Sequence, residues 1–197
     1  MKNYDNPVFR DAQPEDLIVY TCHNLLENKN YSVYTSDEQR TENAIVWIDS
    51  LDPEEGYKKT IGQLGIRLKG NINDWDSVKD LKEEGMYCCL GVACVEFSLL
   101  KDEYSNSENL SNFSNGYDSR LEDLLGLNFN GLFFDREKGR IQVIEIDNKV
   151  MNCLMGVNDH LHEYDSDFSN MRSFILENLS LLFKPEVAEA LRIHYKK

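Results

Sequence analysis

The sequence is short of basic residues, of proline and of long apolar runs, and each shortage argues against a class of protein. Lys and Arg total 21 against 35 Asp and Glu, so the formal net charge is −14. A general DNA or RNA binder needs a basic footprint to displace counterions, and this balance argues against one. The chain has 4 Pro, 41% apolar and 28% charged residues. These values are typical of globular proteins and exclude disorder or a collagen-like repeat.

The apolar stretches are too short for a membrane protein. The longest runs from Met86 to Val95, ten residues where a spanning helix needs about 20. The N-terminus has no apolar segment behind its first Lys, so we expect no secretory signal. Five Cys in a chain of 197 residues is an odd number, and a chain this long builds its own core without disulfides. The sequence therefore predicts a soluble, cytoplasmic protein with reduced thiols and no cofactor.

The periodicity predicts an α+β fold, a mainly helical single domain over residues 1–197. One β-hairpin is expected at about 131–146, and a central buried helix at about 86–100. Residues 1–43 are interpreted as an N-terminal extension packed on this domain, and 101–116 as a polar Ser/Asn-rich surface loop or insertion. Other helices are expected at 14–28, from a cap at Ser36 or Thr41 to Leu51, and at 75–84, 119–127, 148–161, 168–183 and 185–195. Residues 53–75 are expected to form a Gly-punctuated connector.

Three cysteines in one segment are the first candidate for chemistry. Cys88, Cys89 and Cys94 have C-C-x(4)-C spacing inside a predicted helix, whereas zinc sites usually have C-x(2–4)-C spacing on a turn. On a helix, Cys89 and Cys94 point about 140° apart. We therefore interpret these cysteines as small core residues and expect Cys89 to be buried.

The acidic stretch at 159–167 is the second candidate, with four carboxylates and two imidazoles in nine residues. It lacks the order of a calcium loop, with its central Gly and terminal Glu. A solvated loop before the helix at 168 is the simpler interpretation, so no metal site is predicted. Asp159 with His160 or His162 remains a weak candidate for general acid–base catalysis.

A small-ligand site is the third candidate. Trp47, Tyr57 and Tyr87 offer rings that stack on a base, and Arg67 offers a cation for a phosphate. Asn158 and Asp159 follow an apolar helical run and complete the candidate set. The same aromatic residues also fit a core, and the glycine-rich phosphate loops of nucleotide-binding proteins are missing from the sequence.

Six short segments together resemble a family. They are WIDSL at 47–51, YKKT at 57–60, QL at 63–64, YCCLGVAC at 87–94, LMGVND at 154–159 and SF at 173–174. The pattern resembles a group of small uncharacterised proteins of phages and prophages, over roughly residues 44–180. Ala93, Lys59 and Val157 depart from it, and the N-terminus and the Ser/Asn loop are longer. The resemblance implies a phage origin and no assigned activity.

Three functions follow as hypotheses. The first is a phage accessory protein in the host cytoplasm that binds a basic host protein through an acidic surface and so inhibits a host factor or defence system. The second is a small-ligand binder, for instance of a nucleotide signal. The third is a small hydrolase centred on Asp159. The sequence does not fix the oligomeric state, and no contact with nucleic acid or membrane is expected.

Overall fold

The computed structural model describes residues 16–22, 35–60, 64–68, 82–83, 85–104, 120–128, 131–135, 137–161 and 167–196, with backbone only for 18–22, 100–104 and 120–122. The helices are α1 (Asp37–Ser50), the 3₁₀ turn η2 (Pro53–Glu55), α3 (Cys89–Glu96), α4 (Arg120–Leu125), α5 (Leu154–Leu161), α6 (Ser169–Glu177), α7 (Leu179–Leu182) and α8 (Pro185–Tyr195). The strands are β1 (Leu17–Cys22), β2 (Lys58–Lys59), β3 (Gly65–Leu68), β4 (Met86–Tyr87), β5 (Leu100–Tyr104), β6 (Phe134–Asp135), β7 (Arg140–Ile141), β8 (Ile144–Ile146) and β9 (Lys149–Met151).

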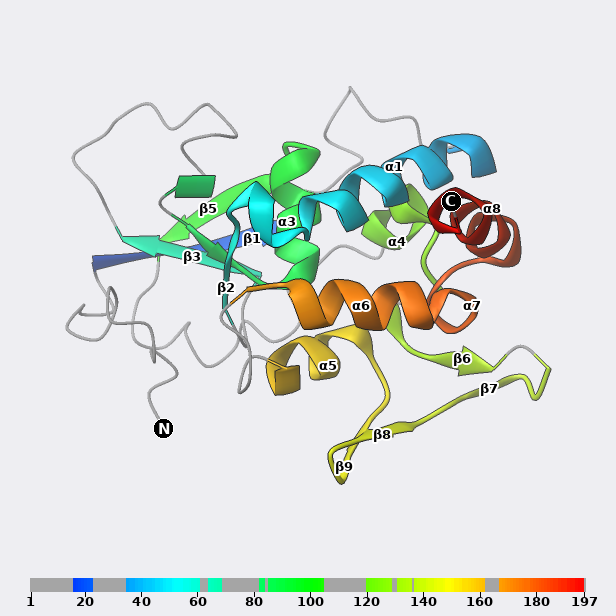
Figure 1. Ribbon diagram of the computed structural model, residues 1–197. Coiled ribbons are helices and arrows are strands. Elements are labelled where there is room, and N and C mark those ends of the chain that lie inside the picture. Colours follow the sequence, from blue (N-terminus) through cyan, green and yellow to red (C-terminus); the bar gives the residue numbers. More distant parts are fainter. Residues whose placement is uncertain are drawn as a thin grey trace.

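A five-stranded sheet in the order β2-β4-β3-β1-β5 lies at one end of the molecule (Figure 1). β1 pairs antiparallel with both β3 and β5, so it is flanked on either side. The prediction of a helix over 14–28 is therefore wrong for 17–22. A short run rich in β-branched residues fits a strand between two neighbours as well as a helix, and periodicity does not separate the two. The segment predicted as a loop at 101–116 begins as β5, and residues 105–116 lie outside the described residues.

Helix α1 begins and ends where its sequence directs. The Ser36 side chain accepts a hydrogen bond from the Gln39 amide at 3.2 Å, which caps the first turn. Asp52 and Pro53 end the helix, because a proline disfavours helical geometry in the residue before it. The buried face of α1, with Trp47 and Ile48 at its centre, packs on α3, α4 and α8. The boundary expected at residue 43 falls inside this helix.

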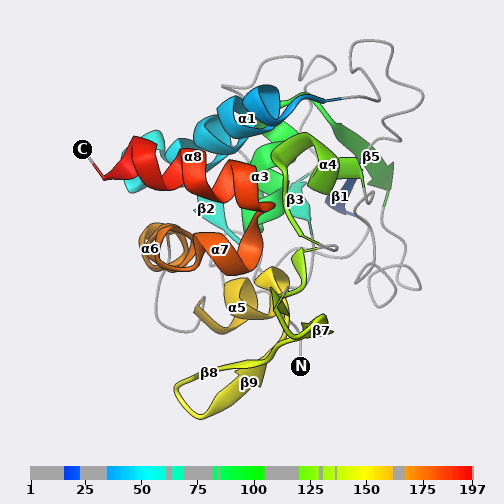
Figure 2. The same ribbon diagram turned by 90° about the vertical axis from the view of Figure 1, so that its right-hand side faces the viewer.

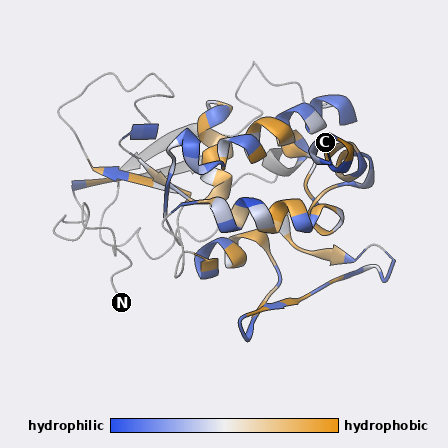
Figure 3. Ribbon diagram, in the orientation of Figure 1, coloured by the Kyte–Doolittle hydropathy of each residue, from blue (hydrophilic) through white to orange (hydrophobic). Residues whose placement is uncertain are grey.

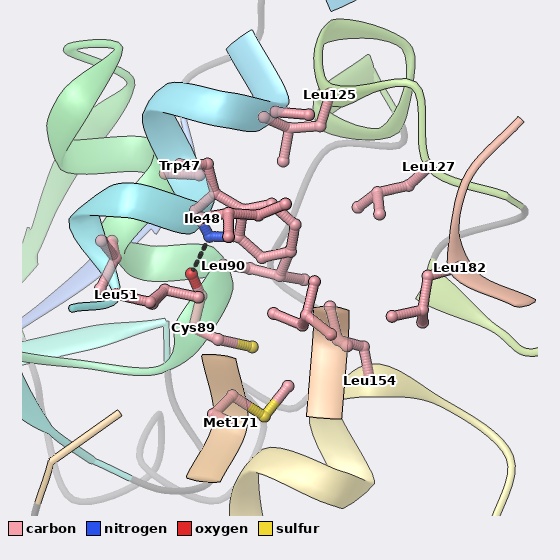
Figure 4. Close-up of a cluster of buried hydrophobic side chains, with 14 of the residues drawn as sticks. Trp47, Ile48, Leu51, Cys89, Leu90, Leu125, Leu127, Leu154, Met171 and Leu182 are labelled. Carbon is pink, nitrogen blue, oxygen red and sulfur yellow. Dashed lines mark hydrogen bonds between the residues drawn. The ribbon is translucent and has the colours of Figure 1, made fainter. Parts of the chain in front are cut away.

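The buried helix predicted at 86–100 is confirmed as α3, although it is shorter. Residues 86–87 form β4, the helix covers 89–96, and every residue from Cys89 to Val95 is buried. Figure 4 shows the surrounding core, in which side chains from α1, α3, α5, α6 and α7 meet. These side chains belong to one continuous cluster of buried residues. Such a cluster is expected around α3, because a helix that is apolar on all its faces must be covered on all sides.

The C-terminal third forms α5, α6, α7 and α8, which cover the side of α3 away from the sheet (Figure 2). Ahead of them, β6 and β7 pair as a hairpin within the span predicted at 131–146. This hairpin is shorter than predicted, because residues 144–146 form β8 and pair with β9 instead. β8 and β9 form a second hairpin, and α5 begins at Leu154 rather than at the predicted residue 148. The signal for this hairpin is Asp147-Asn148, which adopts φ values of 50° and 63°.

Together these elements make an α+β single domain, as predicted. Within the described part of the chain, every helix is too short or too polar to cross a lipid bilayer.

Candidate functional site

The segment YCCLG joins β4 to α3, and each residue has a packing reason to be there. The Cys88 sulfur accepts a hydrogen bond from the Gly91 amide at 3.4 Å, so Cys88 serves as the N-cap of α3. A Cβ at Gly91 would lie 1.8 Å from the carbonyl oxygen of Leu64. The helix therefore approaches the chain just before β3 so closely that only glycine fits. The most distinctive motif in the sequence is thus explained by backbone packing.

Asn158 lies beside this junction, fully buried, and its side chain joins three segments. Its Oδ1 accepts a hydrogen bond from the Cys89 amide at 3.0 Å. Its Nδ2 donates to the Thr60 carbonyl at 3.1 Å and to Asp159 Oδ1 at 3.2 Å. The amide thereby satisfies an N–H at the start of α3 and a carbonyl at the end of β2 from a position on α5. Asn158 therefore links α5 to the start of α3 and to the residue after β2 through hydrogen bonds.

The thiols at this junction are poor nucleophiles. Cys88 and Cys89 are buried, as the sequence predicts, and both are free. Burial raises the pKa of Cys88 to about 12 and the pKa of Cys89 well above its ordinary value. Asp159 raises both pKa values further, and Lys59 lowers that of Cys89. A reactive cysteine needs an accessible thiolate, so these side chains act as core residues.

The aromatic residues predicted to stack on a ligand lie in the same core. Trp47 is fully buried and its Nε1 donates to the Cys89 carbonyl at 2.7 Å, the bond drawn in Figure 4. Tyr87 is also fully buried, and Tyr57 is 4% exposed. The two tyrosine rings meet edge to face at 5.9 Å, and the Tyr57 hydroxyl donates to Glu96 at 2.6 Å. The structure brings these rings together, but their faces are covered by protein.

Arg67 is also buried, on β3, where its Nη1 donates to the Leu68 carbonyl at 3.3 Å. A second buried cation, Lys59 on β2, escaped the sequence analysis because a lysine in a polar stretch gives no sign of burial. Its Nζ lies 5.8 Å from the centre of the ring of Phe168, the residue before α6. Neither cation is exposed to a phosphate in solution.

The acid–base candidates separate in the structure. Asp159 is half-buried and accepts from Asn158, whereas His160 is buried with its Nε2 3.4 Å from Asp147 in the β8–β9 turn. Neighbours in sequence thus face different partners. His162 lies outside the described residues, as does most of the acidic stretch up to 166. Among the residues that the structure does describe, no three His, Cys, Asp or Glu side chains gather as a metal site would require.

A surface feature that the motif search missed lies on α1 and η2. Residues 37–55 contain seven acidic residues and a single basic one, Arg40. The Arg40 guanidinium bonds to Asp37 at 2.8 Å and to Asp123, so its charge is already compensated. Five of the acidic residues are exposed, and the three on α1 are spaced so that they share one side of that helix. We call these five residues the acidic stripe, which consists of Glu38, Glu42, Asp49, Glu54 and Glu55.

Several residues of the acidic stripe have contacts within the protein, and Glu38 at its start is hydrogen-bonded to Ser36. Asp49 accepts from the Tyr195 hydroxyl at 2.8 Å and lies 3.5 Å from Arg172, and Glu55 lies 3.0 Å from Lys82. Within the stripe, Val46 is 44% exposed and adds an apolar side chain between the carboxylates. The acidic residues of α1 recur at helical spacing, and this spacing in the sequence would have predicted an acidic face on the helix.

Comparisons with family models, with curated proteins and with solved structures found no match to this chain.

Proposed function

We propose that the protein acts by binding, and that the acidic stripe is the surface that a basic partner protein contacts. The observation that carries this proposal is the composition of residues 37–55, the segment of α1 and η2, with seven acidic residues against one basic residue. In the interior, by contrast, Cys88 and Cys89 are buried, and Asp159 and His160 contact different partners. The resemblance to phage proteins supports a bacterial host factor or defence component as the partner, in the cytoplasm.

The physical basis is electrostatic steering. A face of one sign attracts a partner of the opposite sign over about a Debye length, roughly 8 Å at physiological salt, and raises the rate of encounter. Exposed carboxylates on a helix lose little side-chain solvation until contact is made. Val46 adds an exposed apolar side chain to the charged face. Its burial on contact would contribute affinity that electrostatic steering alone does not provide. Such a complex is expected to weaken as salt is added.

The alternatives rest on residues that the structure uses otherwise. A nucleotide-binding site would need an open face on Trp47, Tyr57 or Tyr87, and these rings are covered. A hydrolase would need Asp159 and His160 to face one substrate, and their contacts lie with Asn158 and Asp147. Binding through the surface is therefore the function best supported by the described residues.

The test compares two variants that each lose three negative charges. The stripe variant carries Glu38→Gln, Glu42→Gln and Glu54→Gln. The control carries Glu137→Gln, Glu177→Gln and Glu186→Gln, which are equally exposed but lie elsewhere. Both are immobilised and incubated with host lysate at several salt concentrations, and the captured proteins are quantified by mass spectrometry. We expect a partner with a basic surface that the control retains and the stripe variant loses by about tenfold or more.

Two results would contradict the proposal. Equal capture by both variants would show that total charge, rather than the acidic stripe, determines binding. Capture that does not decrease with salt would show that the interface is not electrostatic.

A further inference from the structure

The two hairpins between β6 and β9 form an arm, residues 134–151, that extends below the helical body in Figure 1. We infer that the outer face of this arm is an interface between two copies of the chain. The inference is independent of the acidic stripe, which lies on α1 and η2.

The inner side of the arm is fixed to the body. Ile144 and Ile146 pack against the main core cluster, and Met151 is buried in it. Asp147 at the tip of the β8–β9 turn lies 3.4 Å from Nε2 of the buried His160 on α5. The arm is therefore an ordered surface, so that a partner binding to it has little conformational entropy to remove.

The outer side of the arm is apolar and exposed. Ile141, Val143 and Val150 are 51%, 59% and 66% exposed. Exposure alternates from residue 141 to residue 146. Residues 141, 143 and 145 are exposed, whereas Ile144 and Ile146 pack against the core. Glu145 lies opposite Val150 in the ladder, so Val143 and Val150 are diagonal neighbours on one face. Figure 3 shows hydrophobic residues interspersed with hydrophilic ones along these strands, with hydrophilic residues at the turns.

The charge of the arm identifies the partner. The chain as a whole carries −14, but residues 135–151 contain four acidic and four basic residues, so this segment has no net formal charge. A basic partner is attracted more strongly by the acidic stripe. A face with no net charge is instead the place where two copies of an acidic protein approach without repulsion, since charges farther than about 8 Å are screened.

The pattern of signs also suits a symmetric pair. In a two-fold interface the same patch meets itself, so it must contain both members of every complementary pair. On the arm, the exposed cations Arg140 and Lys149 and the exposed anions Glu145 and Asp147 surround the apolar side chains. An antiparallel approach of two arms places cations against anions around a shared apolar centre. The small size of the patch predicts a weak dimer.

The test is sedimentation velocity of the full chain, from about 5 to about 500 μM. We expect the sedimentation coefficient to rise from that of a monomer to that of a dimer across this range. The variant Val143→Glu with Val150→Glu should weaken association by at least about tenfold, because four carboxylates then meet at the centre of the interface. Circular dichroism and a thermal melt check that the variant remains folded.

The matched control is Leu68→Glu with Ile193→Glu, which replaces two exposed apolar residues with the same added charge on β3 and α8, outside both proposed surfaces. It should dimerise like the wild type. A chain that stays monomeric over the whole range would overturn the inference, and so would equal weakening by both double variants. Loss of partner capture by the stripe variant leaves the dimer unaffected, so the two proposals fail separately.

Discussion

The junction around α3 and the arm differ in what their residues offer and in what they expose. The junction holds Cys88, Cys89, Trp47 and Asn158, residue types with evident chemistry, and buries all four. The arm is built from common aliphatic and charged residues, and its outer face is open. In this protein, therefore, the residues that look most functional in the sequence maintain the structure. The surfaces that remain free for recognition are made of residues that no motif search selects.

The largest effect that separates these regions is expected at Gly91. An alanine Cβ there would meet the backbone oxygen of Leu64 at 1.8 Å, and backbone cannot move aside as a side chain does. Gly91→Ala should lower the free energy of unfolding by at least about 3 kcal/mol or prevent folding. Urea denaturation followed by circular dichroism measures the effect.

The matched control is Gly156→Ala in α5. Its Cβ would make only ordinary contacts, the closest 3.6 Å from the Cys153 sulfur. Alanine favours helix over glycine, so this variant should be more stable by about 0.5 to 1 kcal/mol. Equal stabilities of the two alanine variants would contradict the close approach of α3.

The next largest effect is expected at Asn158. Asn158→Ala leaves the Cys89 amide and the Thr60 carbonyl without the partner they have now, and both are buried. The loss should be about 2 to 3 kcal/mol in urea denaturation. Asn152→Ala, at an exposed position between β9 and α5, should change stability by less than about 0.5 kcal/mol. A similar small loss at both positions would show that the amide network contributes little.

An intermediate effect should appear at alkaline pH. Burial raises the pKa of Cys88 to about 12 from an ordinary value of 9.0. Above pH 9 the unfolded chain releases this proton and the folded chain retains it, so the free energy of unfolding falls as pH rises toward 12. The slope is at most about 1.4 kcal/mol per pH unit for each such thiol.

Cys88→Ser provides the comparison, because the hydroxyl keeps the N-cap but does not titrate in this range. We expect the alkaline slope to become shallower by the contribution of one thiol, measured as the urea midpoint against pH. An unchanged slope would mean that Cys88 loses its proton as readily in the folded chain as in the unfolded one.

The smallest effect is expected on the arm. Val143→Thr with Val150→Thr keeps the β-branched shape at exposed sites, so dilute protein should change in stability by less than about 0.5 kcal/mol. Val92→Thr and Val157→Thr make the same replacement in the core and should each cost about 1 to 2 kcal/mol, because a hydroxyl is then buried. Similar losses at all four positions would contradict the contrast between the two regions.

The sequence predicted the elements whose local signals agree with their surroundings. α1 has a serine cap and a proline after its end, and α8 begins with Pro185, so these two helices were found close to their true limits. α3 was found because its sequence is apolar on every face, but it is shorter than the predicted 86–100. The α+β class and the β6–β7 hairpin followed from the same kind of signal. β1 was predicted as a helix because Pro14 and two acidic residues precede its apolar run, and only pairing with β3 and β5 decides its conformation.

The candidate sites were harder to predict, because exposure depends on the whole fold. The prediction that Cys89 is buried is confirmed, since an all-apolar helix has few alternatives. The rings of Trp47, Tyr57 and Tyr87 were offered to a ligand and instead lie in the core. Nothing in the local sequence distinguishes an aromatic residue that packs inward from one that faces a ligand.

The most direct test of the account is the reactivity of the cysteines in the native protein. A Cys22→Ser protein is treated with an alkylating reagent at pH 7.5, and each thiol is followed by peptide mass spectrometry. The account predicts that the half-exposed Cys153 is modified first and that Cys88 and Cys89 react at least about a hundredfold more slowly, until the protein unfolds. Rapid modification of Cys88 or Cys89 in the folded protein would contradict it, because the junction around α3 would then be an accessible, reactive site.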